Sequence, residues 1–177
     1  MVLLQGGPGR TLVRSRVADY LRRRQPPPIP RSAALAGIAG ATTIAALGLL
    51  SQLTGMPWLV ASLGASCVLV FLAPDVAFSQ PVNVIGGHLV ATVCGLLVAT
   101  VLPHTWWSAG LGVGLAITAM AVLRLTHPPA GGNPIMIMVS GAGWSTLLTP
   151  ILTGTVVLVV AGVVFHRLRR HPYPLRG

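Results

Sequence analysis

The chain has 177 residues, of which 53% are apolar and only 8% are charged, and its mean hydropathy is +0.78. A soluble globular domain carries about 25% charged residues, so this composition excludes an ordinary soluble enzyme and a disordered protein. It predicts a protein that crosses a bilayer several times, because only lipid tolerates so little charged surface. The net charge of +10 comes from arginines gathered mainly at the two chain ends, which favours membrane flanks over a nucleic-acid surface.

The first 32 residues are rich in arginine and proline and precede the apolar sequence. Residues 11–25 can form a basic amphipathic helix on the cytoplasmic headgroups, and the prolines from Pro26 onward would lead into the bilayer. We therefore predict three parts. These are a cytoplasmic N-terminal segment (1–32), a transmembrane domain (33–166) and a basic cytoplasmic tail (167–177).

Five apolar runs follow the N-terminal segment, and each is long enough, or nearly so, to span a bilayer. A shorter piece between the fourth and the fifth run is broken by glycine and proline. The first run repeats a small residue at every fourth position, which suits close helix packing in lipid. The runs are Ala33–Leu53, Met56–Ala73, Val84–Leu102, Trp106–Leu125 and Ser145–Phe165, and the broken piece is Pro128–Gly143.

The distribution of arginine predicts the topology. Both ends of the chain are rich in arginine and the loops between the runs are nearly free of it, so both termini should be cytoplasmic. An even number of crossings is then required. Either the broken piece crosses as a short helix, giving six crossings, or one weak segment is re-entrant, giving four. We expect the integral plasma (inner) membrane of a bacterium as the location.

A weak internal sequence repeat favours six crossings. The segment Thr54–Pro57 opens the second run, and Thr126–Pro129 opens the broken piece. Each segment follows a full run, precedes a short apolar stretch and leads to another full run. Two three-segment units of this kind would be inverted relative to each other, as in many transporters with discontinuous helices. The same layout also results from a shared need for helix starts, so both interpretations stay open.

The sequence lacks the groups that membrane catalysis would need. Its only acids are Asp19 and Asp75, and no nucleophile, paired carboxylate or phosphate-binding loop is present. Cys67 and Cys94 lie in apolar runs without neighbouring ligands, and we interpret them as small buried hydrophobic residues. We therefore expect no enzyme activity, no metal site and no cofactor.

Three sequence blocks carry a resemblance to a known family. They are Ala61–Phe71, Gln80–His88 and His127–Gly131, in this order, and the last begins with His-Pro-Pro. The sequence from about 33 to 165 resembles the HPP family of integral membrane proteins, which is usually described with four spans. The resemblance implies an all-α polytopic membrane protein with four to six transmembrane segments, some of them short or broken. Plant chloroplast and cyanobacterial members are associated with nitrite transport, which suggests the same for this chain.

Two kinds of residue are candidates for binding an anion. Arg124 is the one internal cation, and the rings of His88 and His127 could donate hydrogen bonds or carry protons. Arg124 could equally anchor the end of a span at the interface, and the histidines could bond only to backbone. Amide groups that could bind oxygen atoms, or could instead cap helices, belong to Gln80, Asn83 and Asn133.

Glycines and prolines in the same blocks should break or start helices, and such breaks are tolerated at membrane depth only where they are buried or line a cavity. We therefore expect the segments 80–88 and 127–133 to approach each other. We also expect a helix to end near Thr126, with Arg124 and His127 acting on one anion. The structural motif residues are Gly64, Pro81, Gly86, Gly87, Pro128, Pro129 and Gly131.

The leading functional hypothesis is a membrane transporter or channel for a small inorganic anion, with nitrite first. The alternative is a non-transporting membrane subunit or scaffold with an assembly role. An assembly module would place its small-residue stripes outward and fill its centre with packed side chains. The expected partners are the anion and the lipid bilayer, without nucleic acid, and a chain this short suits a homo-oligomer.

Overall fold

A computed structural model describes residues 18–23, 27 and 29–175 of the chain. The chain divides into two units, residues 1–30 and residues 31–177. In the first unit residues 18–21 form one helical turn. Most of the basic helix predicted for residues 11–25 lies outside the described residues.

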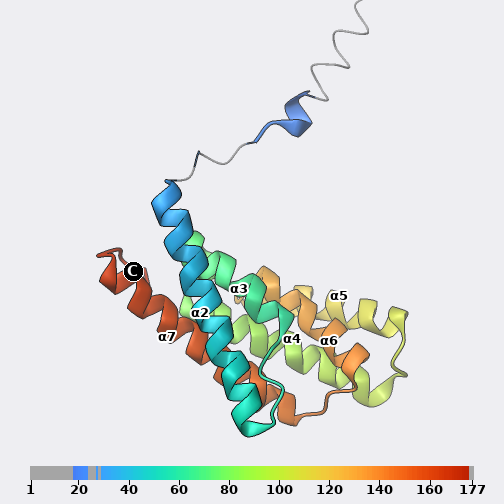
Figure 1. Cartoon of the computed structure of the whole chain (residues 1–177). Helices are drawn as coiled ribbons and strands as arrows, with labels where there is room; N and C mark the ends of the chain where they lie inside the picture. The colour runs from blue at the N-terminus through green and yellow to red at the C-terminus, as the bar shows by residue number, and fades with distance from the viewer. Residues whose placement is uncertain (1–17, 24–26, 28, 176–177) are drawn as a thin grey trace, which may run out of the picture. The chain divides into compact units, whose positions relative to one another are not determined.

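The second unit consists of helices joined by short loops, as the all-α prediction required (Figure 1). The described residues contain no strand. Three short helical turns interrupt the main helices: η1 (Ala77–Ser79), η2 (Pro128–Gly132) and the π-turn η3 (Leu147–Leu152). The main helices are α2 (Pro30–Thr54), α3 (Ala61–Leu72), α4 (Pro81–Val101), α5 (Trp106–Val122), α6 (Asn133–Ser140) and α7 (Thr153–Leu168).

Three helical stretches are long and apolar enough to cross a membrane, judged by length and composition. They are α2, α4 and the continuous stretch Leu147–Leu168, which joins η3 to α7. The helices α3 and α5 are apolar but shorter. α3, with 12 residues, is about 18 Å long, against about 30 Å for the hydrocarbon core of a bilayer.

Two apolar runs are less regular than the sequence predicted. The second run was expected to be helical from Met56, but the helix begins only at Ala61. Gly55 has a φ of +68° and ends α2, and Pro57 disfavours a helical conformation for the residue before it. The last run is interrupted at Thr149, whose φ of −133° and ψ of 113° are extended, directly before Pro150.

Contacts between the helix ends show that successive main helices alternate in direction. At the start of α2, Ser32 accepts a hydrogen bond from Arg169 just after α7 (2.7 Å). The same end of the unit holds the start of α4, because the backbone N–H of Leu175 after α7 donates to Gln80, directly before α4 (2.8 Å). The end of α5 lies there too, because Asn83 in the first turn of α4 donates to the carbonyl oxygen of Thr126 (3.1 Å). The N-terminal end of α2 and the C-terminal end of α7 therefore lie together.

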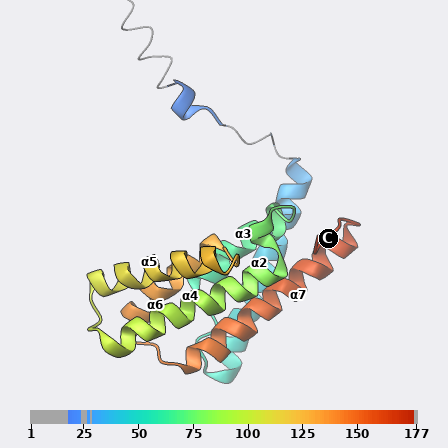
Figure 2. The same cartoon turned by 180° about the vertical axis from the view of Figure 1, so that it is seen from behind.

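α4 is the central helix, and it packs against α5, α6 and α7 (Figure 2). Glycine allows the close approach of α4 and α5 to the start of α6. A Cβ on Gly95 would lie 2.8 Å from the Cα of Pro134, and a Cβ on Gly112 would lie 3.0 Å from the Cβ of Pro134. These two glycines are thus used for packing inside the unit.

α2 packs on the rest of the unit through a face other than its stripe of small residues. Its buried residues are Ala36, Thr43 and Leu47, and Leu47 packs against Trp58 and Leu63. The predicted small stripe is turned away from the core, and a Cβ on Gly37 would meet no atom within 4 Å. The other members of this outward stripe are Ala33, Ala41 and Ala45.

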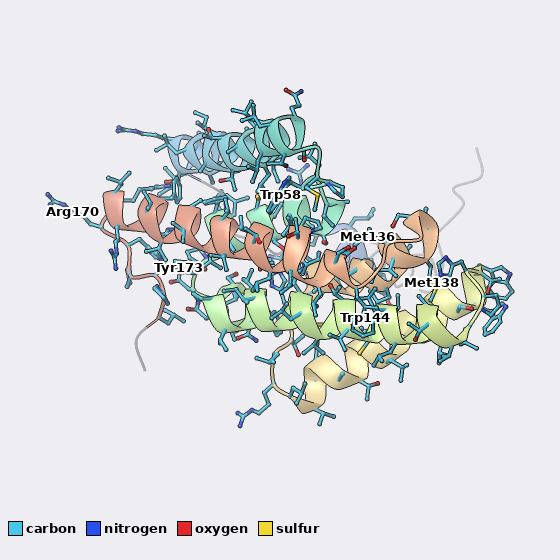
Figure 3. All side chains as sticks on the ribbon, turned by 90° about the horizontal axis from the view of Figure 1, so that it is seen from below. Trp58, Met136, Met138, Trp144, Arg170 and Tyr173 are labelled. Atoms are coloured by element: carbon cyan, nitrogen blue, oxygen red, sulfur yellow. The ribbon has the colours of Figure 1, made fainter. Side chains whose placement is uncertain are left out.

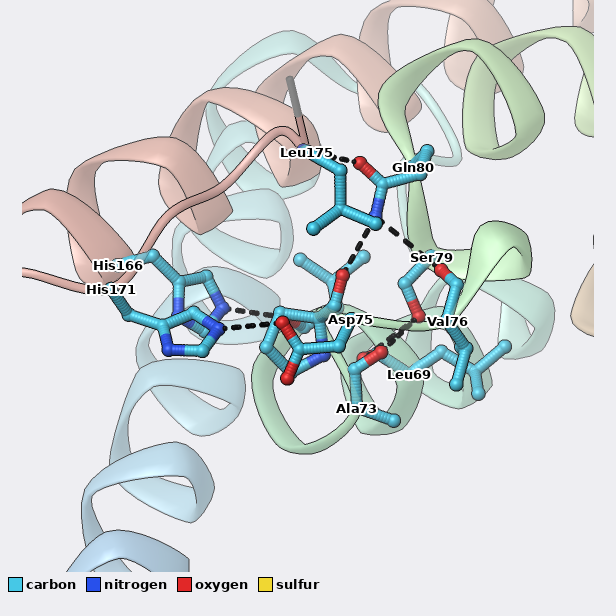
Figure 4. Close-up of polar contacts among 11 residues, drawn as sticks. Leu69, Ala73, Asp75, Val76, Ser79, Gln80, His166, His171 and Leu175 are labelled. Atoms are coloured by element: carbon cyan, nitrogen blue, oxygen red, sulfur yellow. Dashed lines mark hydrogen bonds and ion pairs between the residues drawn. The ribbon is translucent and has the colours of Figure 1, made fainter. Parts of the chain in front are cut away.

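The residues after α7 fold back onto the loop between α3 and α4 (Figure 4). His171 and Asp75 form an ion pair at 3.0 Å, and the backbone N–H of Leu175 donates to the side-chain oxygen of Gln80 (2.8 Å). Tyr173 is buried and donates to the carbonyl oxygen of Ser79 (2.8 Å), and its burial raises the pKa of the phenol to about 12. The neighbouring Arg170 points away from the helices (Figure 3). The described tail is therefore docked, although its arginines remain at the surface.

Candidate functional site: a buried polar cluster

The two short helices α3 and α6 begin at the same place inside the unit. Ser62, in the first turn of α3, donates a hydrogen bond to the side-chain oxygen of Asn133, the first residue of α6 (2.6 Å). The preceding chain reaches this point without α-helix on either side, through residues 55–60 and through the loop and η2 at 123–132. The order of a long, a short and a long helix occurs twice, and the starts of both short helices meet.

Six polar side chains gather at this meeting point, and together they are called the buried polar cluster. They come from α3, from α4, from the loop before η2 and from the first residue of α6. Water cannot reach them, since none is more than 7% exposed and five of the six are 0% exposed. The members are Ser62, Ser66, His88, Thr92, His127 and Asn133.

His127 enters the cluster because the backbone around it approaches α4 very closely. A Cβ on Gly87 would lie 2.6 Å from the Cβ of His127 and 2.8 Å from the carbonyl oxygen of Leu125, so only glycine fits there. Asn83, one turn earlier on α4, holds the same loop through the carbonyl oxygen of Thr126. The other side of the ring is fixed by Nδ1, which donates to the carbonyl oxygen of Phe78 at 2.7 Å.

Asn133 links the two short helices to α4. Its side-chain nitrogen lies 3.1 Å from His88 Nδ1, 2.8 Å from the hydroxyl of Thr92 and 3.3 Å from the carbonyl oxygen of His88. Its oxygen accepts from Ser62. The whole amide is therefore used, which fixes its orientation and that of the His88 ring.

Ser66 stands at the centre of the cluster, between the two histidines. Its oxygen is 2.9 Å from His88 Nε2 and 2.7 Å from His127 Nε2, and the two ring centres are 5.1 Å apart. The same oxygen lies 2.8 Å from the carbonyl oxygen of Ser62. Among the described residues no buried side-chain nitrogen or oxygen lacks a partner. Because the polar atoms satisfy one another, the cluster can exist in an apolar surrounding.

The structure brings together three of the six predicted binding residues. His88, His127 and Asn133 belong to the cluster, and the expected approach of the segments 80–88 and 127–133 is confirmed by the contact between Asn133 and His88. Asn83 holds the loop next to the cluster but bonds to backbone.

The other two predicted binding residues lie outside the cluster. Gln80 bonds to the backbone oxygens of Pro74 and Val76 and to the tail (Figure 4). Arg124 is exposed, in a left-handed turn with a φ of +58°. The helix before it ends at Val122, four residues earlier than the expected end at Thr126, so Arg124 and His127 do not share a helical face.

The predicted motif residues divide into helix starters and sites of close approach. Pro81 opens α4 and Pro128 opens η2, where Pro129 follows. A Cβ on Gly86 would lie 3.0 Å from the side chain of Leu125, so this glycine and Gly87 both pack against the loop before η2. A Cβ on Gly64 or on Gly131 would meet no atom within 4 Å, and the structure gives no packing reason for them.

Three members of the cluster were not predicted from the sequence: Ser62, Ser66 and Thr92. A signal for them exists. Ser62 and Ser66 are four residues apart on α3, and His88 and Thr92 are four apart on α4, so each pair lies on one face of an apolar helix. The partner oxygen of Phe78 is a backbone atom, and no sequence pattern could have identified it.

Comparisons with known proteins agree with the resemblance seen in the sequence. Residues 25–174 match the family model described as "HPP, transmembrane region". Two transmembrane proteins of Dictyostelium discoideum are similar. One is 29% identical over 126 residues, which are 65% of this chain and 40% of the relative. The other is 32% identical over 130 residues, or 68% of this chain and 45% of the relative. The chain thus spans less than half the length of these curated relatives. No solved structure matches.

Proposed function

Because the chain belongs to the HPP family of integral membrane proteins, we propose that it is a transporter or channel for a small inorganic anion, with nitrite as the first candidate. The observation that carries this proposal is the buried polar cluster, in which two histidines, two serines, a threonine and an asparagine meet between two short helices. Buried polar groups at discontinuous helices are typical of substrate sites in membrane transporters.

The chemistry of the cluster favours an anion over a cation. The only acids in the sequence are Asp19 and Asp75, and Asp75 is at the surface, paired with His171. The cluster itself contains hydroxyl, amide and imidazole groups and no carboxylate, so it offers no negative charge to a cation. The start of α3 also directs the positive end of its helix dipole toward the cluster, which stabilises negative charge.

Ion uptake into liposomes that hold the purified protein tests the proposal. We expect uptake of nitrite above that of protein-free liposomes, with nitrate, chloride and formate measured in parallel to define the selectivity. His127→Ala removes two of the hydrogen bonds at the centre of the cluster and should lower uptake about tenfold or more. Thr118→Ala is the matched control, because Thr118 is exposed on α5 and bonds only to its own helix. If none of the four ions enters through folded protein, the transport proposal is wrong.

A second candidate function, assembly, is favoured by the outward stripe of small residues on α2. Gly110 and Gly114 on α5 also face outward, since a Cβ on either would meet no atom within 4 Å. Stripes of this kind let transmembrane helices approach each other closely. Cross-linking through cysteine at Ala41 in a protein without Cys67 and Cys94 tests whether copies of this chain associate along α2. Cysteine at Ala46, which is exposed and lies five residues further along α2 on another side of the helix, is the control.

A further inference from the structure

The hydrogen bonds of the buried polar cluster form one continuous chain. Phe78 contributes a carbonyl oxygen, which can only accept, so the hydrogen on His127 Nδ1 points to it. At the other end the amide nitrogen of Asn133 donates to His88 Nδ1, which leaves the hydrogen of a neutral His88 on Nε2. His88 Nε2 therefore donates to the oxygen of Ser66.

The contact between Ser66 and His127 Nε2 exists in two forms, with His127 either neutral or carrying a second proton. When His127 is neutral, its Nε2 has a lone pair and accepts the hydrogen of the Ser66 hydroxyl (2.7 Å). When His127 carries a second proton on Nε2, that N–H donates to the Ser66 oxygen, and the hydroxyl turns to the carbonyl oxygen of Ser62 at 2.8 Å. Both arrangements use every donor, so a proton can be added by rotating one hydroxyl and without leaving a group unpaired.

The protein supplies no negative charge to balance a protonated His127. Both acids of the sequence are elsewhere, Asp75 at the surface and Asp19 in the N-terminal segment. An unbalanced charge inside an apolar unit is very unfavourable, and this applies to a bound anion as much as to an imidazolium. Bound together, each supplies the counter-charge of the other.

The other titratable groups on the surrounding elements do not change this balance. Within the described residues, α3 carries Cys67 and α4 carries His88 and Cys94, and no other titratable residue lies on these two helices. On α7, Nε2 of His166 donates a hydrogen bond to the carbonyl oxygen of Val70 (2.8 Å). The segments η1, η2 and α6 carry no titratable side chain.

From this geometry we infer that the anion moves together with one proton, which is held on Nε2 of His127 while the hydroxyl of Ser66 accepts that N–H and turns its own hydrogen to the carbonyl oxygen of Ser62. The inference rests on the proposed function and adds the co-substrate to it. The step is balanced: an anion and a proton enter the cluster from one side, no covalent bond other than N–H is made or broken, and both leave on the other side. The net charge moved is zero.

The test uses proteoliposomes of the full chain that enclose a pH-sensitive dye. With an inward nitrite gradient, we expect acidification of the lumen in step with nitrite uptake, at one proton per anion after subtraction of protein-free liposomes. An imposed potential of about 100 mV changes the accumulation of a singly charged ion about 50-fold, and we expect no such change here. Nitrite uptake that follows the potential and leaves the lumen pH unchanged would overturn proton coupling and leave the proposed function intact. No uptake of any anion by folded protein would overturn both.

Ser66 variants test whether this hydroxyl is the hydrogen-bond acceptor of the protonated His127. Ser66→Ala removes the bridging hydroxyl and keeps both histidines, and should lower coupled uptake about tenfold or more. Ser66→Thr keeps a hydroxyl and should restore it. Ser140→Ala removes the same atom from an exposed serine of α6 that bonds back to Met136, and should behave as the wild type. Folding of each variant is verified by circular dichroism and by elution as a single species. Folded Ser66→Ala protein with unchanged uptake and a proton ratio of one would exclude Ser66 as the bridge.

Discussion

At the scale of single residues, the His-Pro-Pro triplet places its histidine in the buried polar cluster, and the glycines that face it make this close approach possible. The prolines start η2, and the preceding His127 is in an extended conformation that turns its ring into the cluster. Gly87 allows the two backbones to approach. The Gly86-Gly87-His88 block and the triplet are therefore two halves of one contact, although 38 residues separate Gly87 from Leu125 in the sequence.

Gly87→Ala should disturb this contact, because the added Cβ would come within 2.6 Å of the Cβ of His127 and within 2.8 Å of backbone. We expect a loss of about 1–3 kcal/mol in stability, which is typical of overpacking. Thermal unfolding in detergent, followed by circular dichroism, measures it. Gly114→Ala is the control, since its Cβ would meet no atom within 4 Å and alanine favours helix. Equal melting temperatures for the two variants would contradict the close approach.

Arg124→Gln tests whether the exposed arginine attracts anions from water. A single positive charge at the surface raises the local anion concentration, and salt screens this effect over about 10 Å at 0.1 M and about 3 Å at 1 M. We expect initial uptake to fall about threefold at low ionic strength and to match the wild type at high ionic strength. Arg170→Gln, at the exposed end of α7, serves as the control. An equal loss at every salt concentration would instead mean that the Arg124 charge acts on the bound ion.

At the scale of elements, the sequence predicted the long helices better than the short ones. A long apolar run in a membrane protein is almost always helical, because the backbone must satisfy its own hydrogen bonds. Accordingly, α2, α4 and α5 begin within three residues of their predicted starts. The start of α3 was misplaced because Met56 to Val60 are apolar yet follow a glycine turn and contain Pro57. For the site, the histidines and Asn133 were recognisable as polar residues in apolar surroundings. The serines were not, since serine is common in membrane helices and bonds to its own backbone.

The docked tail is one of the elements that hold the loop behind His127. Tyr173→Phe keeps the ring but removes the hydrogen bond to the Ser79 carbonyl oxygen, so we expect a loss of about 1 kcal/mol in stability. Thermal unfolding in detergent measures this loss. The control is Tyr20→Phe, since the side chain of Tyr20 is exposed and belongs to the N-terminal unit. A melting temperature like that of the control would mean that the tail does not stabilise the fold.

At the scale of the whole molecule, the alternating helices place the start of α2 and the end of α7 at one end of the unit. The loops at 102–105 and 141–146 follow α4 and α6, which run away from that end. The family match shows an integral membrane protein, and the arginines near both chain ends favour the cytoplasm for that end.

Cysteine labelling tests this orientation. In protein without Cys67 and Cys94, a cysteine at Ser32 and one at Arg170 should react only from the cytoplasmic side, whereas one at His104 should react only from the other side. A membrane-impermeant maleimide applied to intact cells, compared with inverted vesicles, separates the cases. Labelling of Ser32 and Arg170 from opposite sides would contradict both the arrangement of the helices and the even number of crossings.

The docking of the tail also has a consequence for biosynthesis. The loop that holds His127 through the carbonyl oxygen of Phe78 is itself held by residues that lie 94 to 96 positions later in the chain. A ribosome adds about 5–20 residues per second. The tail residues that contact this loop are therefore synthesised several seconds after the loop itself. By then the helices α2 to α7 have been made. The loop behind His127 therefore gains these contacts only after the helices that surround the buried polar cluster have been synthesised.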